Sequence, residues 1–253
     1  MDATYIQEQI KQLKNDIYRH VQHKTLLEYT GYPLVNEHQL FYMLLPFFNG
    51  DEWDDLRYEG IITVGIVQAS LNEHGLIDEC DATSKIQQLT VLSGDYYSGR
   101  YYEILANSGN ISLIQQLSEG VVKRSEHEIR VYEDRHYSLD DWLESLRVIE
   151  TEFITRFYKL YHYSEYTSVM QTALLINRLQ NELLNYKKGN SSLYFQKMIE
   201  NFGSDRLEFE HYIQKEIDHL ADKLKDSLQS VVLKDALRLF IDDLLFSQKL
   251  ERS

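Results

Sequence analysis

The sequence is poor in residues that end helices. It has 11 glycines and 2 prolines in 253 residues, and both prolines, Pro33 and Pro46, lie near the N-terminus. A sheet protein needs many turns, and turns are rich in Gly, Pro, Asn and Asp. A long chain without proline after position 46 therefore predicts helix after helix.

Other absences exclude classes of function. The one cysteine, Cys80, excludes an internal disulfide and a metal site made of several cysteines. The formal net charge of −14 repels phosphate backbones, so we expect no nucleic-acid binding. The N-terminus is polar, and the longest apolar run, Leu40–Phe48, is interrupted by Pro46 and too short for a bilayer. We expect a soluble, cytoplasmic protein without a transmembrane segment.

The sequence does contain many segments in which apolar residues recur at helical spacing. With 43% hydrophobic residues the chain can bury a sizeable core. Apolar residues at helical spacing predict a first helix over about 5–28, with the stripe Ile6, Ile10, Leu13, Ile17 and Val21. Similar patterns predict helical segments over 61–78, 88–108, 111–132, 138–158, 168–187 and 205–246. No repeat or linker is visible, so we expect one all-α helical-bundle domain over 1–253, with C-terminal helices over 161–253.

Two of these segments carry more specific predictions. Ser138 and Asp141 form a Ser-x-x-Asp capping sequence, which should open the helix that follows. In the 111–132 segment we expect one buried face, made of Leu113, Leu117, Val121 and Ile129.

Four consecutive segments carry a resemblance to a known family. They are Val67–Asp78, Gln87–Asn110 with its Gly94-Asp95-Tyr96 core, Ile111–Glu133 and Tyr137–Leu160. In this order they resemble helices of trans-type polyprenyl diphosphate synthases. A lone Gly-Asp-Tyr would be weak, whereas four ordered segments are specific. The resemblance covers about residues 61–160 best and implies the isoprenoid synthase fold.

The chain departs from that family where its metal site would be. Active members present Asp-Asp-x-x-Asp, whose aspartates share magnesium ions with the substrate diphosphate. The matching positions here read His74-Gly75-Leu76-Ile77-Asp78, so His74 and Gly75 replace the first two aspartates and Asp78 alone remains. Because Mg²⁺ prefers oxygen ligands, we expect this chain to hold no metal.

Further departures remove the groups that hold diphosphate in the family. Between Asp78 and Asp95 the chain has Lys85 but no arginine, and the family's Lys-Thr pair is matched by Glu150-Thr151. Its Gly-Glu-x-x-Gln string is matched by Gly120–Arg124, which lacks both the Glu and the Gln. The string that most resembles a second aspartate-rich motif, at 240–246, lacks its last aspartate, so we expect a terminal amphipathic helix there. No catalytic residue is predicted.

This pattern resembles the small subunit, component 1, of heteromeric hexaprenyl or heptaprenyl diphosphate synthases. The resemblance implies a large catalytic subunit that carries both aspartate-rich motifs and the Mg²⁺. It also implies a non-catalytic role in supporting activity and product length, with the product serving as the menaquinone side chain. The apolar product could bring the complex to the membrane surface.

The resemblance places the Gly-Asp-Tyr helix at or near a subunit interface. It thus makes Asp95, Tyr96, Tyr97, Arg100 and Tyr101 candidates for contact with the large subunit, and internal packing is the alternative. Asp95 could instead pair with Arg100 or cap a backbone group. We also hypothesise that the chain contacts the growing polyprenyl chain and completes its tunnel. Small residues such as Ala69 and Ser70 would then face the tunnel, unless they only permit close helix packing.

Three other interpretations stay open. The first is an active prenyltransferase with a degenerate metal site made of Glu73, His74 and Asp78. The second is a di-iron protein, because Glu-x-x-His occurs at Glu133…His136 and Glu208…His211, although neither pair fits an inward-facing helix face well. The third is a generic helical adaptor, which composition alone allows.

Overall fold

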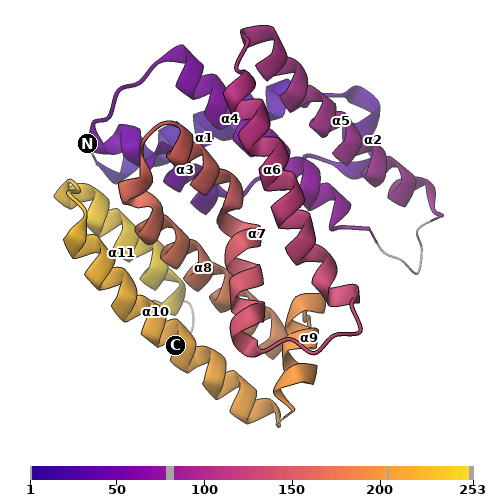
Figure 1. The fold of residues 1–253 in the computed structure, drawn as a ribbon, viewed down its shortest axis with the longest axis vertical. Coiled ribbons are helices and arrows are strands. Elements are labelled where there is room, and N and C mark those ends of the chain that lie inside the picture. Colours follow the sequence, from indigo (N-terminus) through magenta and orange to yellow (C-terminus); the bar gives the residue numbers. More distant parts are fainter. Residues whose placement is uncertain (1, 78–82, 204, 251–253) are drawn as a thin grey trace. The chain divides into compact units, whose positions relative to one another are not determined.

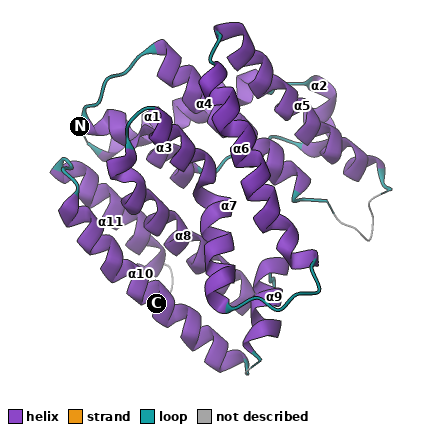
Figure 2. Cartoon of the chain, viewed as in Figure 1, coloured by secondary structure: helices purple, strands orange, loops and turns teal. Residues whose placement is uncertain are grey.

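The computed structural model describes residues 2–77, 83–203 and 205–250, and all regular elements in these ranges are helices (Figures 1 and 2). This confirms the all-α class. The α-helices are α1 (Ala3–His20), α2 (Lys24–Thr30), α3 (Glu37–Asn49), α4 (Asp55–His74), α5 (Lys85–Ser108), α6 (Ile111–Glu128), α7 (Leu139–Leu160), α8 (Thr167–Lys187), α9 (Leu193–Phe202), α10 (Arg206–Ser230) and α11 (Asp235–Leu250). Two short 3-10 helices, η2 (Ile129–Tyr132) and η3 (Ser164–Tyr166), precede α7 and α8.

The helices fall into two compact units. The first comprises Met1–Ser118 with Lys159–His162, and the second comprises Glu119–Tyr158 with Tyr163–Ser253. The single domain over 1–253 stays a prediction. No helix in the described ranges is both long and apolar enough to cross a membrane.

The first unit is built around α4, which is buried along most of its length. Residues 60–70 of α4 are all buried, and the predicted apolar stripe of α1 is buried as well. Gly65 lets the two helices approach closely, since a Cβ at this position would lie 2.4 Å from Ile17 Cδ1. The α1 stripe is thus confirmed as core.

The predicted end of the first helix is wrong. The chain breaks after α1 and restarts at α2, where His23 Nδ1 accepts a hydrogen bond from the Leu26 amide at 3.4 Å. Pro46 lies inside α3, which continues to Asn49. Val21 and Leu26 are both buried, so the apolar pattern of the sequence continues across residues 21–23. The pattern therefore could not reveal that the His23 side chain caps a new helix there.

The second unit contains the predicted capping sequence. The Asp141 amide donates to Ser138 Oγ at 3.2 Å, and the Ser138 amide donates to Asp141 Oδ2 at 3.0 Å. This reciprocal pair satisfies backbone donors at the start of α7. The helix then runs to Leu160, close to the predicted end.

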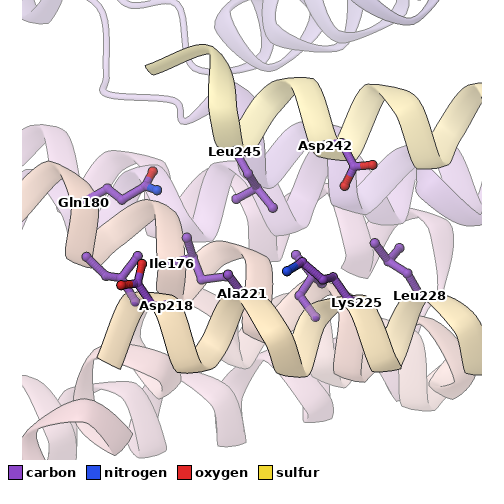
Figure 3. A pocket seen from close by; sticks show the side chains of 10 residues that line it. Ile176, Gln180, Asp218, Ala221, Lys225, Leu228, Asp242 and Leu245 are labelled. Carbon is purple, nitrogen blue, oxygen red and sulfur yellow. The ribbon is translucent and has the colours of Figure 1, made fainter. Parts of the chain in front are cut away.

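Helices α8, α10 and α11 pack together in this unit. The predicted 205–246 segment is two helices, and α11 buries Leu237, Ile241 and Leu245 while Asp242 and Asp243 stay exposed. A cavity of about 20 Å³ remains between the three helices, where Ile176, Ala221 and Leu245 converge (Figure 3). That volume is enough for about one water molecule. The terminal segment is thus an amphipathic helix, as expected from the sequence.

Candidate functional site

The former first motif lies at the C-terminal end of α4. The helix ends at His74, and the amide of Gly75 donates to the Leu71 carbonyl oxygen at 3.1 Å. Asp78, the one aspartate that the sequence retains here, lies outside the described residues. Of the motif's first and last positions, the structure therefore describes only the one occupied by His74.

The His74 imidazole faces α5 at the Gly-Asp-Tyr sequence. Its Nε2 lies 3.6 Å from Asp95 Oδ1, and a Cβ added to Gly94 would come within 2.6 Å of the ring. The glycine of Gly-Asp-Tyr is thus the surface on which the ring rests. The structure pairs Asp95 with His74 rather than with Arg100, whose Nε donates to the His20 carbonyl oxygen at 3.0 Å.

Glu73, next to His74, is a carboxyl group in an unfavourable environment. Glu73 is 3% exposed, and burial raises the pKa of its carboxyl group from 4.5 to about 7. Tyr97 on α5 has no exposed surface, and burial, reinforced by the Glu73 charge, raises the pKa of its hydroxyl to about 12. Both shifts show surroundings that disfavour negative charge.

These residues do not fit a magnesium–diphosphate site. The position of the first aspartate holds an imidazole in contact with Asp95, the second holds a glycine, and Glu73 lies where ionisation is costly. Magnesium needs several oxygen ligands in near-octahedral geometry. The cluster described here offers a packed histidine–aspartate pair instead.

A second cluster, in the other unit, surrounds the matched Lys-Thr position. Arg178 on α8 donates from Nη1 to Glu150 Oε1 at 2.6 Å, and its Nη2 lies 2.7 Å from Glu182 Oε1. Glu150 is 9% and Glu182 is 5% exposed. Burial would lower the pKa of the guanidinium, but the two carboxylates raise it above its usual value. Glu150, Arg178 and Glu182 are called the Arg178 cluster below.

The Arg178 cluster gives a structural role to Glu150, which replaces the lysine of the family's Lys-Thr pair. At Glu150 the chain carries a negative charge where the resemblance expects a positive one, and an arginine of the same unit neutralises it. A half-buried cation held by two buried carboxylates is already satisfied and has little to offer a diphosphate. The arrangement is a closed ion cluster inside the protein.

The positions matched to Gly-Glu-x-x-Gln also carry ion pairs. Lys123 Nζ lies 3.0 Å from Glu152, and Arg124 Nε donates to Glu128 at 2.9 Å. Gly120 itself is required, because a Cβ there would lie 2.9 Å from the Phe153 ring. The glycine is thus kept for packing while its neighbours engage internal carboxylates.

The five predicted interface residues divide into two groups. Asp95 is exposed, and Tyr96 and Arg100 keep part of their surface. Tyr97 is 0% and Tyr101 9% exposed, so both pack inside the first unit, which was the alternative. A role in partner contact stays a prediction for all five.

The other residues singled out from the sequence lie elsewhere. Lys85 donates to Tyr29 Oη at 2.7 Å and lies 3.9 Å above its ring. Ser70 donates to the Gly94 carbonyl oxygen at 2.8 Å, which is the close α4–α5 packing given as the alternative to a tunnel wall. The residues of both Glu-x-x-His pairs are exposed, and in the described ranges no three His, Cys, Asp or Glu residues are grouped to hold a metal.

Sequence reasoning missed Arg178 and Glu182. Their spacing of four residues on one helix was readable as an ion pair. Their contact with Glu150, 28 residues away from Arg178 on another helix, was not, although a buried glutamate at position 150 would have implied a cation nearby.

Comparisons with known proteins agree with the fold and its resemblance. A family model described as heptaprenyl diphosphate synthase (HEPPP synthase) subunit 1 matches residues 23–229. A curated relative, heptaprenyl diphosphate synthase component 1 from Geobacillus stearothermophilus, is 28% identical over 140 residues, which are 55% of this chain. The match spans 64% of that relative, less than two thirds of its length.

Solved structures show the same fold. Geranylgeranyl pyrophosphate synthase from Lactobacillus brevis is similar with a TM-score of 0.68 at 13% identity, covering 96% of each chain. Heptaprenyl diphosphate synthase from Staphylococcus aureus has a TM-score of 0.63 at 15% identity, also covering 96% of each chain. These likenesses confirm the isoprenoid synthase fold that the sequence predicted.

Proposed function

This chain belongs to the family of heptaprenyl diphosphate synthase subunit 1, and from that membership we propose that it is the non-catalytic subunit of a heteromeric long-chain polyprenyl diphosphate synthase. Its partner would be a large subunit with two aspartate-rich motifs and the Mg²⁺. The complex would make a hexaprenyl or heptaprenyl diphosphate for the menaquinone side chain. The assembly would be cytoplasmic, with the apolar product linking it to the membrane surface.

The observation that carries this proposal is the packed His74–Asp95 pair. His74 lies at a position where the resemblance places a metal-bound carboxylate, and its ring contacts Gly94 closely. The Arg178 cluster supports the same conclusion from the second unit. The first cluster offers a single exposed carboxylate, Asp95, which lies beside His74, and the second offers an arginine that two carboxylates already hold. We therefore assign the chemistry to the partner.

The outer face of α5 supports the predicted contact with that partner. Leu92, Asp95, Gly99 and Tyr102 follow one another at spacings of three and four residues, and all four are exposed. Leu92 is 53% and Tyr102 is 55% exposed, and nothing lies within 4 Å of a Cβ added to Gly99. A face with two large apolar side chains around a glycine allows another helix to approach closely.

The test is reconstitution. The isolated chain, a large subunit with both motifs from the same organism, and their mixture are each incubated with an allylic diphosphate, isopentenyl diphosphate and Mg²⁺. We expect long-chain product from the mixture and none from the isolated chain. Product from the isolated chain would establish the active-prenyltransferase alternative, and a mixture no more active than the large subunit would favour a different helical adaptor.

The contact with the polyprenyl chain is tested in the same mixture. An Ala69→Leu variant should change the product length if this part of α4 faces a tunnel. A Ser230→Leu variant, at an exposed position of α10, is the control. An unchanged length in a folded Ala69→Leu complex would contradict the tunnel hypothesis and favour plain helix packing.

A further inference from the structure

Helices α7 and α8 of the second unit run antiparallel. Gln171 on α8 donates to Thr155 Oγ1 on α7 at 3.0 Å. Further along α8, Arg178 donates to Glu150, which lies earlier on α7. Rising residue numbers on one helix therefore meet falling numbers on the other.

Helix α10 runs antiparallel to α8 as well. The hydroxyl oxygens of Ser168 and Ser227 lie 2.8 Å apart, and Lys187 Nζ lies 3.9 Å from Glu210 Oε2. Helices α7 and α10 are therefore parallel to each other on either side of α8 (Figure 1). Between them a groove of about 570 Å³ remains along α8, a size typical of small-molecule sites.

The two walls of this groove carry the same order of side chains. On α7 the order is Asp140, Leu143 and Arg147, and on α10 it is Glu216, Leu220 and Lys223. Residues three, four and seven positions apart share one face of a helix. Because the walls are parallel, both carboxylates lie at one end of the groove, both leucines in the middle and both cations at the other end. We call it the α7–α10 groove.

The carboxylate end is visible in its effect on Tyr212. Burial raises the pKa of the Tyr212 hydroxyl, and the charges of Glu216 and Asp140 raise it further. Both carboxylates therefore act on the same side chain from the two walls. Asp140 is exposed and Glu216 is half-buried, and neither forms an ion pair within the described part of the chain.

The cation end has donors to spare. Arg147 holds Glu144 with Nε at 2.7 Å and Nη2 at 2.5 Å, which leaves its Nη1 unused among the described residues. Lys223 is exposed and forms no ion pair in the ranges that the structure describes. Since α8 begins at this end, Ser164 and Thr167 add hydroxyl groups to it.

The floor between the two ends is apolar and carries one unused hydroxyl. Leu143, Leu175 and Leu220 line it and are buried. Thr172 also lines the groove and is 5% exposed, yet its hydroxyl has no hydrogen-bond partner among the described residues. Because nearly buried polar groups are usually hydrogen-bonded, this hydroxyl is available to a bound molecule.

We propose that the α7–α10 groove binds a small zwitterion, a molecule with a cationic and an anionic group at opposite ends of an apolar chain. Its cation lies between Asp140 and Glu216, its chain lies over the leucines, and its anion lies beside Lys223. On the walls, the charged ends are separated from 140 to 147 and from 216 to 223. At a rise of 1.5 Å per residue this is about 10 Å, which sets the length of the ligand.

The charges of the groove disfavour simpler ligands. A molecule with two anionic groups meets repulsion at the carboxylate end, and an alkyl amine leaves Lys223 without a counter-charge. The inference goes beyond the proposed function and does not rest on it. The groove lies within one unit, and its ligand is tested on the full chain alone.

The first experiment uses 8-aminooctanoate as the probe, because its extended chain has about the length of the groove between the charged ends. Binding is followed by NMR of labelled leucine methyl groups in the full-length protein. We expect saturable shifts at Leu143, Leu175 and Leu220. Octylamine and octanoate each lack one charge and should bind about fivefold more weakly, as expected for the loss of one partly exposed ion pair.

The second experiment removes one charge of the groove at a time. Glu216→Gln and Lys223→Gln should each weaken binding of 8-aminooctanoate about fivefold. Glu208→Gln and Lys215→Gln, at exposed positions of α10 outside the groove, are the matched controls and should change nothing. The single-charge probes give the direction of binding: Glu216→Gln should weaken octylamine alone, and Lys223→Gln should weaken octanoate alone.

Three results would overturn the proposal. One is the absence of leucine shifts at any soluble concentration of 8-aminooctanoate. Another is equal affinity for 8-aminooctanoate and octylamine, since the cation end would then have no role. The third is a response of the leucines to an extended Lys-Ala-Ala-Glu peptide but not to 8-aminooctanoate, which would assign the groove to a protein segment. The reconstitution of synthase activity is independent of all three.

Discussion

Replacing Glu73 by glutamine should make the protein more stable at neutral pH. Glu73 is 3% exposed, and burial raises its pKa to about 7. In the unfolded chain its pKa is near 4.5, so at neutral pH the unfolded state ionises this group more readily than the folded state does. Glutamine has nearly the same shape and no charge, and it removes this difference.

The sign and size follow from proton linkage. A carboxyl group whose pKa is raised by folding leaves stability unaffected below about pH 4.5 and reduces it as the pH rises towards 7. With pKa values of 4.5 and about 7, the loss is about 0.8 kcal/mol at pH 5 and about 3 kcal/mol at pH 8. The stability of Glu73→Gln relative to the wild type should thus increase by about 2.5 kcal/mol between these pH values.

The measurement is urea unfolding of both proteins at pH 5 and pH 8, followed by circular dichroism. Other titrating groups are present in both proteins and largely cancel in the difference. Glu165→Gln, an exposed acid on η3, is the control and should show no such change. A relative stability of Glu73→Gln that stays constant within about 0.5 kcal/mol would refute the reasoning, since it would mean that Glu73 is solvated in the folded protein.

Further predictions concern the Arg178 cluster and the glycines of α5. Arg178→Met should cost about 3–5 kcal/mol of unfolding free energy because it leaves Glu150 and Glu182 buried without their counter-ion. A loss below about 1 kcal/mol in urea unfolding would contradict this, and adding Glu150→Gln and Glu182→Gln to the Arg178→Met variant should recover most of the stability. Gly94→Ala should destabilise by about 1–3 kcal/mol, since its Cβ meets the His74 ring. Gly99→Ala, in open space on the same helix, should stabilise by up to about 1 kcal/mol, and the opposite order of melting temperatures would count against this account.

Much of the fold could be predicted from local patterns. The scarcity of glycine and proline predicted the helices, and the Ser138–Asp141 sequence located the start of α7. Boundaries were predicted less well where a side chain decides them, as at His23. Helix α9 was missed because it is short and lies between two glycines, Gly189 and Gly203.

The candidate site could be predicted only in part. The loss of aspartates at His74 and Gly75 is visible in the sequence, because it concerns single positions. The contact of His74 with Asp95 and the ion pair of Arg178 with Glu150 join different helices, so no spacing reveals them. Ile129 was assigned to the same helix face as Leu113 and Leu117, yet it is 53% exposed, because hydrophobicity alone does not show whether an apolar residue is buried.

Because of the Arg178 cluster, the charge balance of these buried carboxylates does not depend on dissolved cations. A protein that balances clustered carboxylates with bound magnesium loosens when a chelator removes the ion. Here the balancing charge is covalently part of α8 and stays protonated at any physiological pH. Treatment with a chelator should therefore leave the folding of this chain unchanged.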